Sequence, residues 1–472
     1  MSDKYQSKKK KKKFKQSQRF KKSVMNTTDK AYSPKSKEVF AKAGHTHKGG
    51  LEKLLPFGSD GPCPHLHLCG ACKLLPLPYS EQLLWKEKDL RTYLNSYPSL
   101  SPIKVEHSTQ RARPFAYRHT VKPSIRPNPD QPQQIKIGLY QSKSHRLLDL
   151  QDCIVQSQAI NHLLNHLRQL CPQVGLNAYQ PGDERVEDQH SKLRYIVLRQ
   201  GTEETLYLTL VVTYINWTIL EKLKQKLLDY HPQLIGIAIH QHRLTGNAIF
   251  DYTQPTHQYW GQNFLKTSLK TTEASTEKLD LKISATSFAQ VNPEVAQWAY
   301  QKVIAGLKPQ GNEIVLDLYC GVGAIGLLLA HYLRENGKKL HKLYGLEETP
   351  SSIMDAKENA QQNEFTEVEF LQGRVEDNLS KLYADKLRYQ SLPILVVLNP
   401  SRRGCQENVL KEIVNCNPSK IAYMSCHART KTRDLNILHH LGYEAKTITL
   451  FDMFPGSPHY ETVSILSRRH DA

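Results

Sequence analysis

The segment from Val315 to Gly326 constrains the fold of this chain more than any other. It begins with the apolar residues of a buried strand, interrupted by Asp317, and ends in three closely spaced glycines, Gly321, Gly323 and Gly326. Glycines at such a turn let the backbone approach a bound nucleotide, and the following helix presents its N-terminus to that ligand. The segment therefore predicts a strand, a Gly-rich turn and a helix in a nucleotide-binding α/β domain.

Strand and helix patterns alternate from about residue 280 to the end of the chain, as in a sheet of parallel strands. In such a sheet, ligands bind beyond the carboxyl ends of the strands. An acid at a strand end commonly binds ribose hydroxyls, while the glycines alone fit either NAD or S-adenosylmethionine (SAM). Three further predicted strands, 344–347, 394–398 and 420–425, lead to Glu347, Asn399 and Cys426.

A thiol and a carboxylate in the C-terminal part of the chain suggest covalent chemistry beside the nucleotide site. Cys426 follows a strand, and Glu461 lies downstream near the C-terminus. A cysteine in this position is by itself most often an ordinary buried thiol. Its convergence with the other strand-end residues favours a role in function instead.

Three cysteines in one Pro/Gly-rich loop predict a metal centre. The thiolates of Cys63, Cys69 and Cys72 would repel one another unless a cation or cluster neutralised them. Cys153 is the best fourth ligand, although a histidine of the loop could instead complete a zinc site. A trio with one distant cysteine is more typical of iron–sulfur than of zinc, so the spacing favours a [4Fe–4S] cluster.

The basic character of the chain is concentrated at its start. Residues 1–50 hold 16 Lys and Arg against 3 Asp and Glu, which is +13 of the formal net charge of +19. Six consecutive lysines, Lys8 to Lys13, repel one another and have few apolar neighbours to bury, so the segment is predicted to be disordered. It could anchor RNA phosphates through counterion release or simply solubilise the protein.

The middle of the chain has a mixed α/β pattern. Residues 79–94 have the apolar stripe of an amphipathic helix, and 135–140 and 206–212 have the pattern of strands. Basic and aromatic residues occur together over 111–118, which suits either RNA contact or a solvated loop. We expect a tail over 1–50, a central domain over 51–275 and a nucleotide-binding domain over 276–472.

The sequence also bounds where the protein works. No apolar N-terminal segment resembles a secretory signal, and no apolar run reaches the ~18 residues of a membrane-spanning helix. Nine cysteines in a chain expected to be cytoplasmic favour metal binding or catalysis over disulfides. We expect no membrane partner, and a monomer as the default state.

Several motifs occur in the order found in one family. They are Cys63 to Cys72, Phe288 to Pro293, Asn399 to Gly404, Ser425-Cys426 and His459 to Val463. From about residue 60 onward, the chain resembles the RNA uracil-C5 methyltransferases, specifically the iron–sulfur branch that acts on 23S rRNA. The resemblance implies a Rossmann-like SAM-dependent methyltransferase domain and a mixed α/β central domain with an iron–sulfur cluster.

The resemblance also implies roles for individual residues. Cys426 matches the thiol that adds to uracil C6, and Glu461 matches the base that removes the C5 proton. Phe288 matches a residue that packs near a base extruded from its stack. SAM contacts fall on Gln290, Asp317, Tyr319, Gly321, Glu347 and Asn399, and the cluster ligands are Cys63, Cys69, Cys72 and Cys153.

The chain departs from the family pattern at three positions. Asn399 stands where the family usually has Asp, His427 where it has Asn, and Ala289 where it has a second Phe. Asn399 keeps a carbonyl acceptor but lacks the charge. Besides 5-methyluridine formation in 23S rRNA, two hypotheses stay open. One is an RNA-binding or ribosome-assembly protein with weakened catalysis. The other is the same chemistry on tRNA, against which the cysteine cluster argues.

Overall fold

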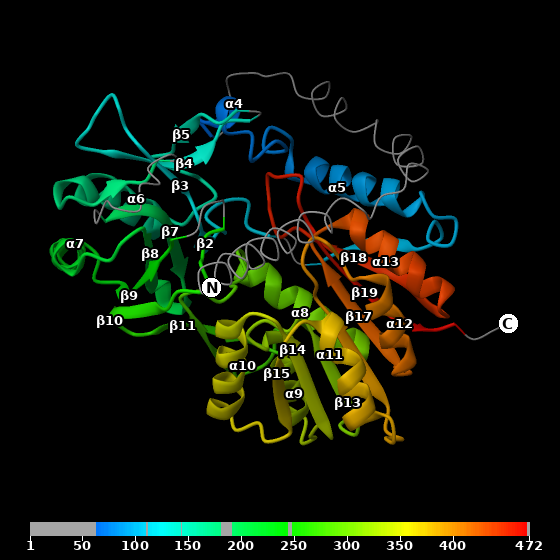
Figure 1. Cartoon of the computed structure of the whole chain (residues 1–472). Coiled ribbons are helices and arrows are strands. Elements are labelled where there is room, and N and C mark those ends of the chain that lie inside the picture. Colours follow the sequence, from blue (N-terminus) through cyan, green and yellow to red (C-terminus); the bar gives the residue numbers. More distant parts are fainter. Residues whose placement is uncertain (1–62, 110–111, 143, 181–190, 244–247, 470–472) are drawn as a thin grey trace, which may run out of the picture. The chain divides into compact units, whose positions relative to one another are not determined.

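The computed structural model describes residues 63–109, 112–142, 144–180, 191–243 and 248–469 (Figure 1). The lysine-rich tail predicted for residues 1–50 lies outside these ranges. Within them, no helix has both the length and the apolar character that a membrane span requires. The strands form an eight-stranded, a nine-stranded and a two-stranded sheet.

The eight-stranded sheet is formed mainly by the second half of the chain. Its order is β1-β18-β19-β17-β16-β13-β14-β15, and neighbouring strands are parallel except where β19 pairs with β17 and β18. The strands span Lys104–His107 (β1), Ile314–Leu318 (β13), Lys342–Glu347 (β14), Val368–Gln372 (β15), Ile394–Leu398 (β16), Lys420–Ser425 (β17), Tyr443–Phe451 (β18) and Glu461–Arg468 (β19).

Helices cover both faces of this sheet, which is why its central strands are continuous apolar runs. Val315 of β13 belongs to the core that also holds residues of α8, α9 and α10, and the next residue, Leu316, belongs to the core shared with α5, α11, α12 and α13. This doubly wound arrangement confirms the predicted Rossmann-like α/β fold. The helices span Tyr79–Leu94 (α5), Pro293–Leu307 (α8), Ala324–Glu335 (α9), Pro350–Gln362 (α10), Val375–Leu382 (α11), Glu407–Asn415 (α12) and Ala428–His440 (α13).

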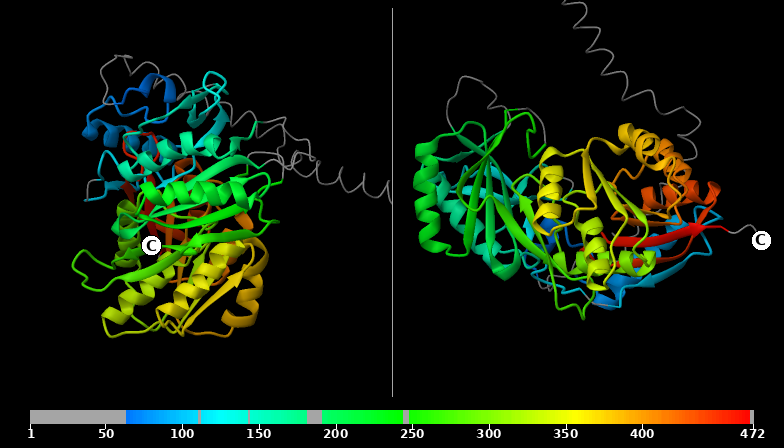
Figure 2. Two further views of the ribbon diagram at one scale, coloured as in Figure 1. Left: turned by 90° about the vertical axis from the view of Figure 1, so that its left-hand side faces the viewer. Right: turned by 90° about the horizontal axis from the view of Figure 1, so that it is seen from below.

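The nine-stranded sheet is mixed and is built around β7. The path is β10-β9-β8-β7-β3-β4-β5, with β2 and β6 also paired to β7, and α6 and α7 pack on one face (Figure 2). The elements span Thr120–Val121 (β2), Ser124–Pro127 (β3), Ile135–Tyr140 (β4), Leu147–Asp149 (β5), Gln158–Gln173 (α6), Asn177–Ala178 (β6), Lys192–Gln200 (β7), Leu206–Val212 (β8), Trp217–Tyr230 (α7), Leu234–Gln241 (β9) and Thr256–Gly261 (β10).

Shorter elements complete the described part of the chain. The antiparallel pair β11 and β12 lies next to α10, because the side chain of Asn359 bonds to both backbone groups of Lys282. The remaining elements are β11 (Phe264–Leu269), β12 (Leu279–Ser284), the helix α4 (Leu66–Cys69), and the single turns Thr202–Glu204 (η1) and Tyr383–Leu387 (η2).

The first described segment is tied to the C-terminal half of the chain. Strand β1 pairs with β18, and the buried Lys86 of α5 forms a 2.5 Å ion pair with Asp452. Lys86 also donates to the carbonyl of Phe454 (3.1 Å). The predicted boundary between a central domain (51–275) and a nucleotide-binding domain (276–472) stays a prediction. Strand β1 lies before this boundary in the sequence but belongs to the eight-stranded sheet.

Candidate active site

The carboxyl ends of four adjacent parallel strands meet at one edge of the eight-stranded sheet. The glycine turn follows β13, Glu347 ends β14, Asn399 follows β16 and Cys426 follows β17. Strand β19 runs the opposite way, so its first residue, Glu461, lies at the same edge. The register pairs Ser425 with Thr462, which places Cys426 and Glu461 at neighbouring positions.

The glycine turn has the conformation of an open cradle. Tyr319, Gly321 and Gly323 all have positive φ (61°, 56° and 80°), a region in which glycine is favoured. A Cβ built on Gly321 would meet nothing within 4 Å, so the backbone faces open space there. The Gly321 amide donates to Glu347 Oε2 (3.1 Å), which holds the carboxylate beside this space.

The side chain of Asp317 stabilises the glycine turn through a hydrogen bond to its last glycine, Gly326. Its Oδ2 accepts from the Gly326 amide (2.9 Å), while Oδ1 is buried and has no hydrogen-bond partner among the described residues. Burial raises the pKa of Asp317 to about 7, with a further increase from the charge of Glu347. The open backbone, the strand-end acid and this buried acceptor fit a nucleotide-like ligand.

The segment that carries Phe288 and Gln290 is held by the nine-stranded sheet. Arg199 of β7 is fully buried and donates to the carbonyls of Ser284 (2.7 Å) and Ser287 (2.5 Å). Phe288 is 59% exposed, and the side chain of Gln290 bonds to the buried Tyr300 of α8. The exposed ring of Phe288 is therefore available to stack against a base.

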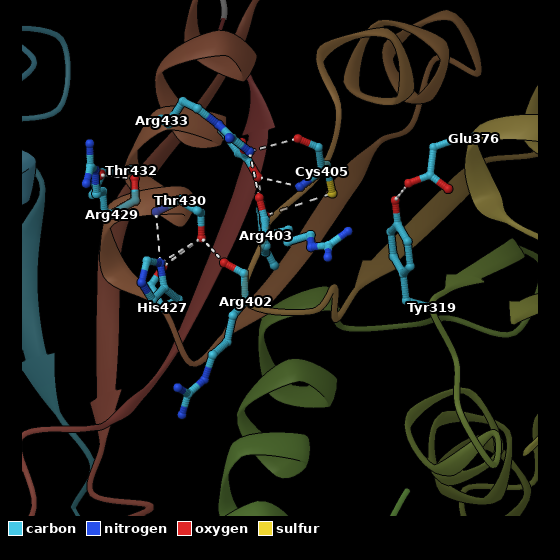
Figure 3. Close-up of polar contacts among 12 residues, drawn as sticks. Tyr319, Glu376, Arg402, Arg403, Cys405, His427, Arg429, Thr430, Thr432 and Arg433 are labelled. Atoms are coloured by element: carbon cyan, nitrogen blue, oxygen red, sulfur yellow. Dashed lines mark hydrogen bonds and ion pairs between the residues drawn. The ribbon is translucent and has the colours of Figure 1, made fainter. Parts of the chain in front are cut away.

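Two further predicted cofactor residues have defined contacts. The hydroxyl of Tyr319 donates to Glu376 Oε1 (3.1 Å), so the ring extends toward α11 (Figure 3). Asn399 is half-buried, and its backbone N–H donates to the carbonyl of Leu318 (3.4 Å) between β16 and β13.

Cys426 is half-buried and Glu461 is buried, and the two side chains interact electrostatically. Burial raises the pKa of the Cys426 thiol, Glu461 raises it further, and Arg402, whose side chain bonds to the thiol, lowers it. Glu461 is only 5% exposed, and its Oε1 has no hydrogen-bond partner in the part of the chain that the structure describes. Burial raises the pKa of Glu461 to about 8, against the opposing charges of Lys431 and Arg402. A carboxyl with a pKa near neutrality can act as a general base.

Lys431 of α13 joins the two strands that carry this pair. The fully buried Nζ donates to the carbonyls of Tyr423 (2.9 Å) and Thr462 (3.1 Å) and to Thr462 Oγ1 (3.1 Å). These three acceptors match the three protons of an ammonium group. Burial lowers the pKa of Lys431 to about 7, and Glu461 opposes this shift. Sequence reasoning missed Lys431, since a lysine on a helix is usually solvent-exposed.

His427 caps a helix. It is the N-cap residue of α13, and its Nδ1 accepts from the Thr430 amide (3.4 Å). Burial lowers the pKa of His427, as do Arg402 and Arg429, which keeps the ring neutral near pH 7. Asn, the family residue, is itself a good cap, so the replacement preserves this local structure.

The structure brings the four predicted cluster cysteines into one region. Cys63 and Cys72 flank α4, Cys69 is the last residue of this helix, and Cys153 follows β5. Burial raises the pKa of Cys72 to about 12, and the other three thiols contribute to the shift. Among the described side chains, no three His, Cys, Asp or Glu are arranged so as to hold a metal ion. The thiol-only donor set and its mutual repulsion nevertheless fit a cationic centre.

The chain is similar to known methyltransferases. A family model described as a methyltransferase domain matches residues 309–446. A protein of Bacillus cereus named as an uncharacterized RNA methyltransferase is 31% identical over 428 residues, covering 89% of this chain and 86% of the relative. A similarly named protein of Halalkalibacterium halodurans is 29% identical over 443 residues, with 92% and 90% covered.

A solved structure shares the fold. Pyrococcus abyssi tRNA (uracil-54, C5)-methyltransferase, in complex with S-adenosyl-L-homocysteine, superposes with a TM-score of 0.64 over 84% of each chain, at 24% identity. The glycine cradle and the strand-end residues described above thus lie in a methyltransferase fold.

Proposed function

Because this chain belongs to the RNA methyltransferase family, we propose that it transfers the methyl group of SAM to C5 of uracil in 23S rRNA, producing 5-methyluridine. One observation carries the proposal: the strand ends hold the thiol of Cys426 next to the carboxyl of Glu461, at the same edge of the sheet as the glycine cradle. A thiol and a base are the two groups that methylation of uracil C5 requires.

The chemistry follows from the poor nucleophilicity of uracil C5. The thiolate of Cys426 adds to C6, and the electron pair displaced from the C5–C6 double bond makes C5 nucleophilic. SAM, when bound, supplies an electrophilic methyl group. Glu461 then removes the C5 proton, the C5–C6 double bond re-forms, and the Cys426 thiolate leaves. The target base must leave its stack to reach these groups, and the exposed Phe288 offers it a surface.

Arg402 supports the first step. A buried thiol is largely protonated and unreactive at neutral pH. The guanidinium of Arg402 bonds to the Cys426 side chain and opposes the increase in its pKa. Arg402 thus stabilises the thiolate that attacks C6.

The glycine cradle is the proposed SAM site. Glu347 would hold the ribose hydroxyls beside the open backbone of Gly321. Asn399 would accept through its carbonyl oxygen, which needs no negative charge. The full set of proposed contacts is Gln290, Asp317, Tyr319, Gly321, Glu347 and Asn399.

We also propose that Cys63, Cys69, Cys72 and Cys153 hold a [4Fe–4S] cluster. Support comes from the mutual repulsion of four gathered thiols, which a cationic centre would relieve. Protein purified without oxygen should contain iron and acid-labile sulfide in the ratio of the cluster. The variant in which all four cysteines are replaced by serine should contain neither; metal-free wild-type protein, or zinc in place of iron, would contradict the assignment.

The same chemistry on tRNA is the second candidate. The similar solved structure from P. abyssi is named as a tRNA methyltransferase, although an identity of 24% supports only a shared fold. The four gathered cysteines favour the rRNA branch, since the tRNA branch typically lacks them.

RNA containing 5-fluorouridine tests the proposal directly. Fluorine replaces the C5 proton that Glu461 would remove, so the covalent Cys426–RNA adduct cannot break down and is trapped. We expect a SAM-dependent covalent complex with 23S rRNA transcripts that survives a denaturing gel and is absent in Cys426→Ala. A complex formed only with tRNA transcripts would favour the second candidate. No complex with either RNA would favour the weakened, non-catalytic RNA-binding hypothesis.

A further inference from the structure

Two segments beside Cys426 carry a group of exposed arginines. Arg402 and Arg403 lie in the loop after β16, and Arg429 and Arg433 lie on the first two turns of α13 (Figure 3). Arg402 reaches the thiol and belongs to the active site. Of the other three, Arg433 contacts Cys405, Arg403 lies two residues before Cys405 in the loop, and Arg429 precedes Thr430 on α13.

Hydrogen bonds fix the loop to the helix. Arg433 Nη2 donates to the carbonyls of Arg403 (3.1 Å) and Cys405 (2.8 Å), and Thr430 Oγ1 donates to the carbonyl of Arg402 (3.1 Å). Asp434 is buried and accepts from the Cys405 amide (2.8 Å). The backbone that carries Arg403 is therefore held in one position relative to α13.

The group carries more positive than negative charge, because four arginines face two carboxylates, Asp434 and Asp89. Arg433 Nε donates to Asp434 Oδ1 (2.8 Å), so its guanidinium is paired. Burial lowers the pKa of His427, and Arg402, Arg429 and Arg433 lower it further. Asp89 opposes the shift only in part. An anion is therefore favoured at this surface.

We propose that Arg403 and Arg429 bind phosphates of the RNA strand that flanks the target uridine, with Arg433 as the positioning residue that holds Arg403 in place. The proposal deepens the proposed function and rests on it. A guanidinium binds phosphate oxygens through two parallel N–H donors. Arg429 is three residues from Cys426 in the chain and Arg403 is next to Arg402, so both phosphates would lie close to the reacting base.

The salt dependence of RNA binding tests this surface without requiring catalysis. A single-stranded, uridine-containing 15-mer RNA is titrated in the absence of SAM at several salt concentrations. Each phosphate contact to a single strand contributes ~0.7 to the slope of log K against log salt. The double variant Arg403→Gln/Arg429→Gln should therefore lose ~1.4 of slope and bind about 25-fold more weakly at 0.1 M salt.

Matched variants separate charge from structure. Arg468→Gln/Arg469→Gln removes two exposed arginines at the opposite end of β19 and should leave the slope unchanged. Arg403→Lys/Arg429→Lys keeps both charges and should retain the wild-type slope. SAM binding, measured in parallel, should be equal in all the variants.

The outcomes separate the assignment of the phosphate contacts from the proposed function. If wild type binds RNA and the glutamine double variant keeps the full slope, the phosphate assignment is overturned while the proposed function stands. The assignment is also overturned if the lysine double variant loses as much slope as the glutamine variant. If wild type binds no RNA, the proposed function itself is contradicted.

Discussion

Replacing Lys431 by methionine should slow the release of methylated RNA from the enzyme. Methionine has a similar length, so the substitution removes the buried charge while leaving little empty space. It deprives the carbonyls of Tyr423 and Thr462 of a donor and removes the positive charge that lowers the pKa of Glu461 most. The other charged or titratable groups facing Glu461 are Arg402, Cys426 and Tyr300, and they remain.

The magnitude follows from the ionised fraction of Glu461. With a pKa of about 8, about one side chain in eleven carries the charge at pH 7. Each further unit of pKa, equivalent to ~1.4 kcal/mol of lost charge interaction, lowers that fraction about tenfold. We therefore expect removal of the C5 proton at pH 7 to slow by about tenfold or more, and the rate to recover as the pH is raised.

The assay follows the covalent protein–RNA adduct on denaturing gels across a pH series with SAM present. Lys431→Met should accumulate the adduct at pH 7 and release it at higher pH, whereas Glu461→Gln should retain it at every pH. Lys431→Arg keeps the charge and should restore release in part, and Lys222→Met, at an exposed position on α7, serves as the matched control. A folded, SAM-binding Lys431→Met with the wild-type pH profile would refute the reasoning.

Three further predictions concern stability and cofactor binding. Lys86→Met leaves the buried carboxylate of Asp452 without its cation and should lower the free energy of unfolding, measured in urea, by about 3–5 kcal/mol; an unchanged midpoint would contradict the burial of the pair. Gly321→Ala should weaken SAM binding measured by calorimetry, because the added Cβ enters the open cradle. Gly337 also has a positive φ and open surroundings, so Gly337→Ala should lower only the folding stability, by ~1 kcal/mol of backbone strain. Equal SAM affinities of the two variants would show that Gly321 is not part of the SAM site. Asp317 keeps its proton in the folded state up to about pH 7 but loses it near pH 4 when unfolded, so its contribution is present at low pH and is lost, by up to about 4 kcal/mol, as pH rises from 4 through 7. Unfolding curves of Asp317→Asn should lack this slope; an identical slope would show that another group causes it.

The predicted elements agree most closely with the structure where burial leaves little choice. The strand predicted at 394–398 and the helix at 79–94 have the bounds that the structure shows for β16 and α5. A run of apolar residues buried on both faces, or a clear apolar stripe, determines such elements locally. The convergence at the sheet edge also followed from topology, because parallel strands place their carboxyl ends together.

What the sequence did not reveal depends on pairing between distant residues. Nothing local to Lys104–His107 indicates that it pairs with β18, some 340 residues later. Lys86 and Lys431 look like solvent-exposed residues of amphipathic helices, and only the folded chain shows that each is buried against a carboxylate or carbonyls. The cap formed by His427 was not predicted either, because the preferred N-cap residues are Ser, Thr, Asp and Asn.

The central claim is that Cys426 is the nucleophile required for methyl transfer from SAM to uracil C5. It is tested most directly with isotopically labelled SAM and unmodified 23S rRNA. Wild-type enzyme and Cys426→Ala are compared, and any product is mapped to its nucleotide. We predict labelled 5-methyluridine with the wild type and none with Cys426→Ala, while both bind SAM. Label at another atom or base, or equal transfer by Cys426→Ala, would contradict the account.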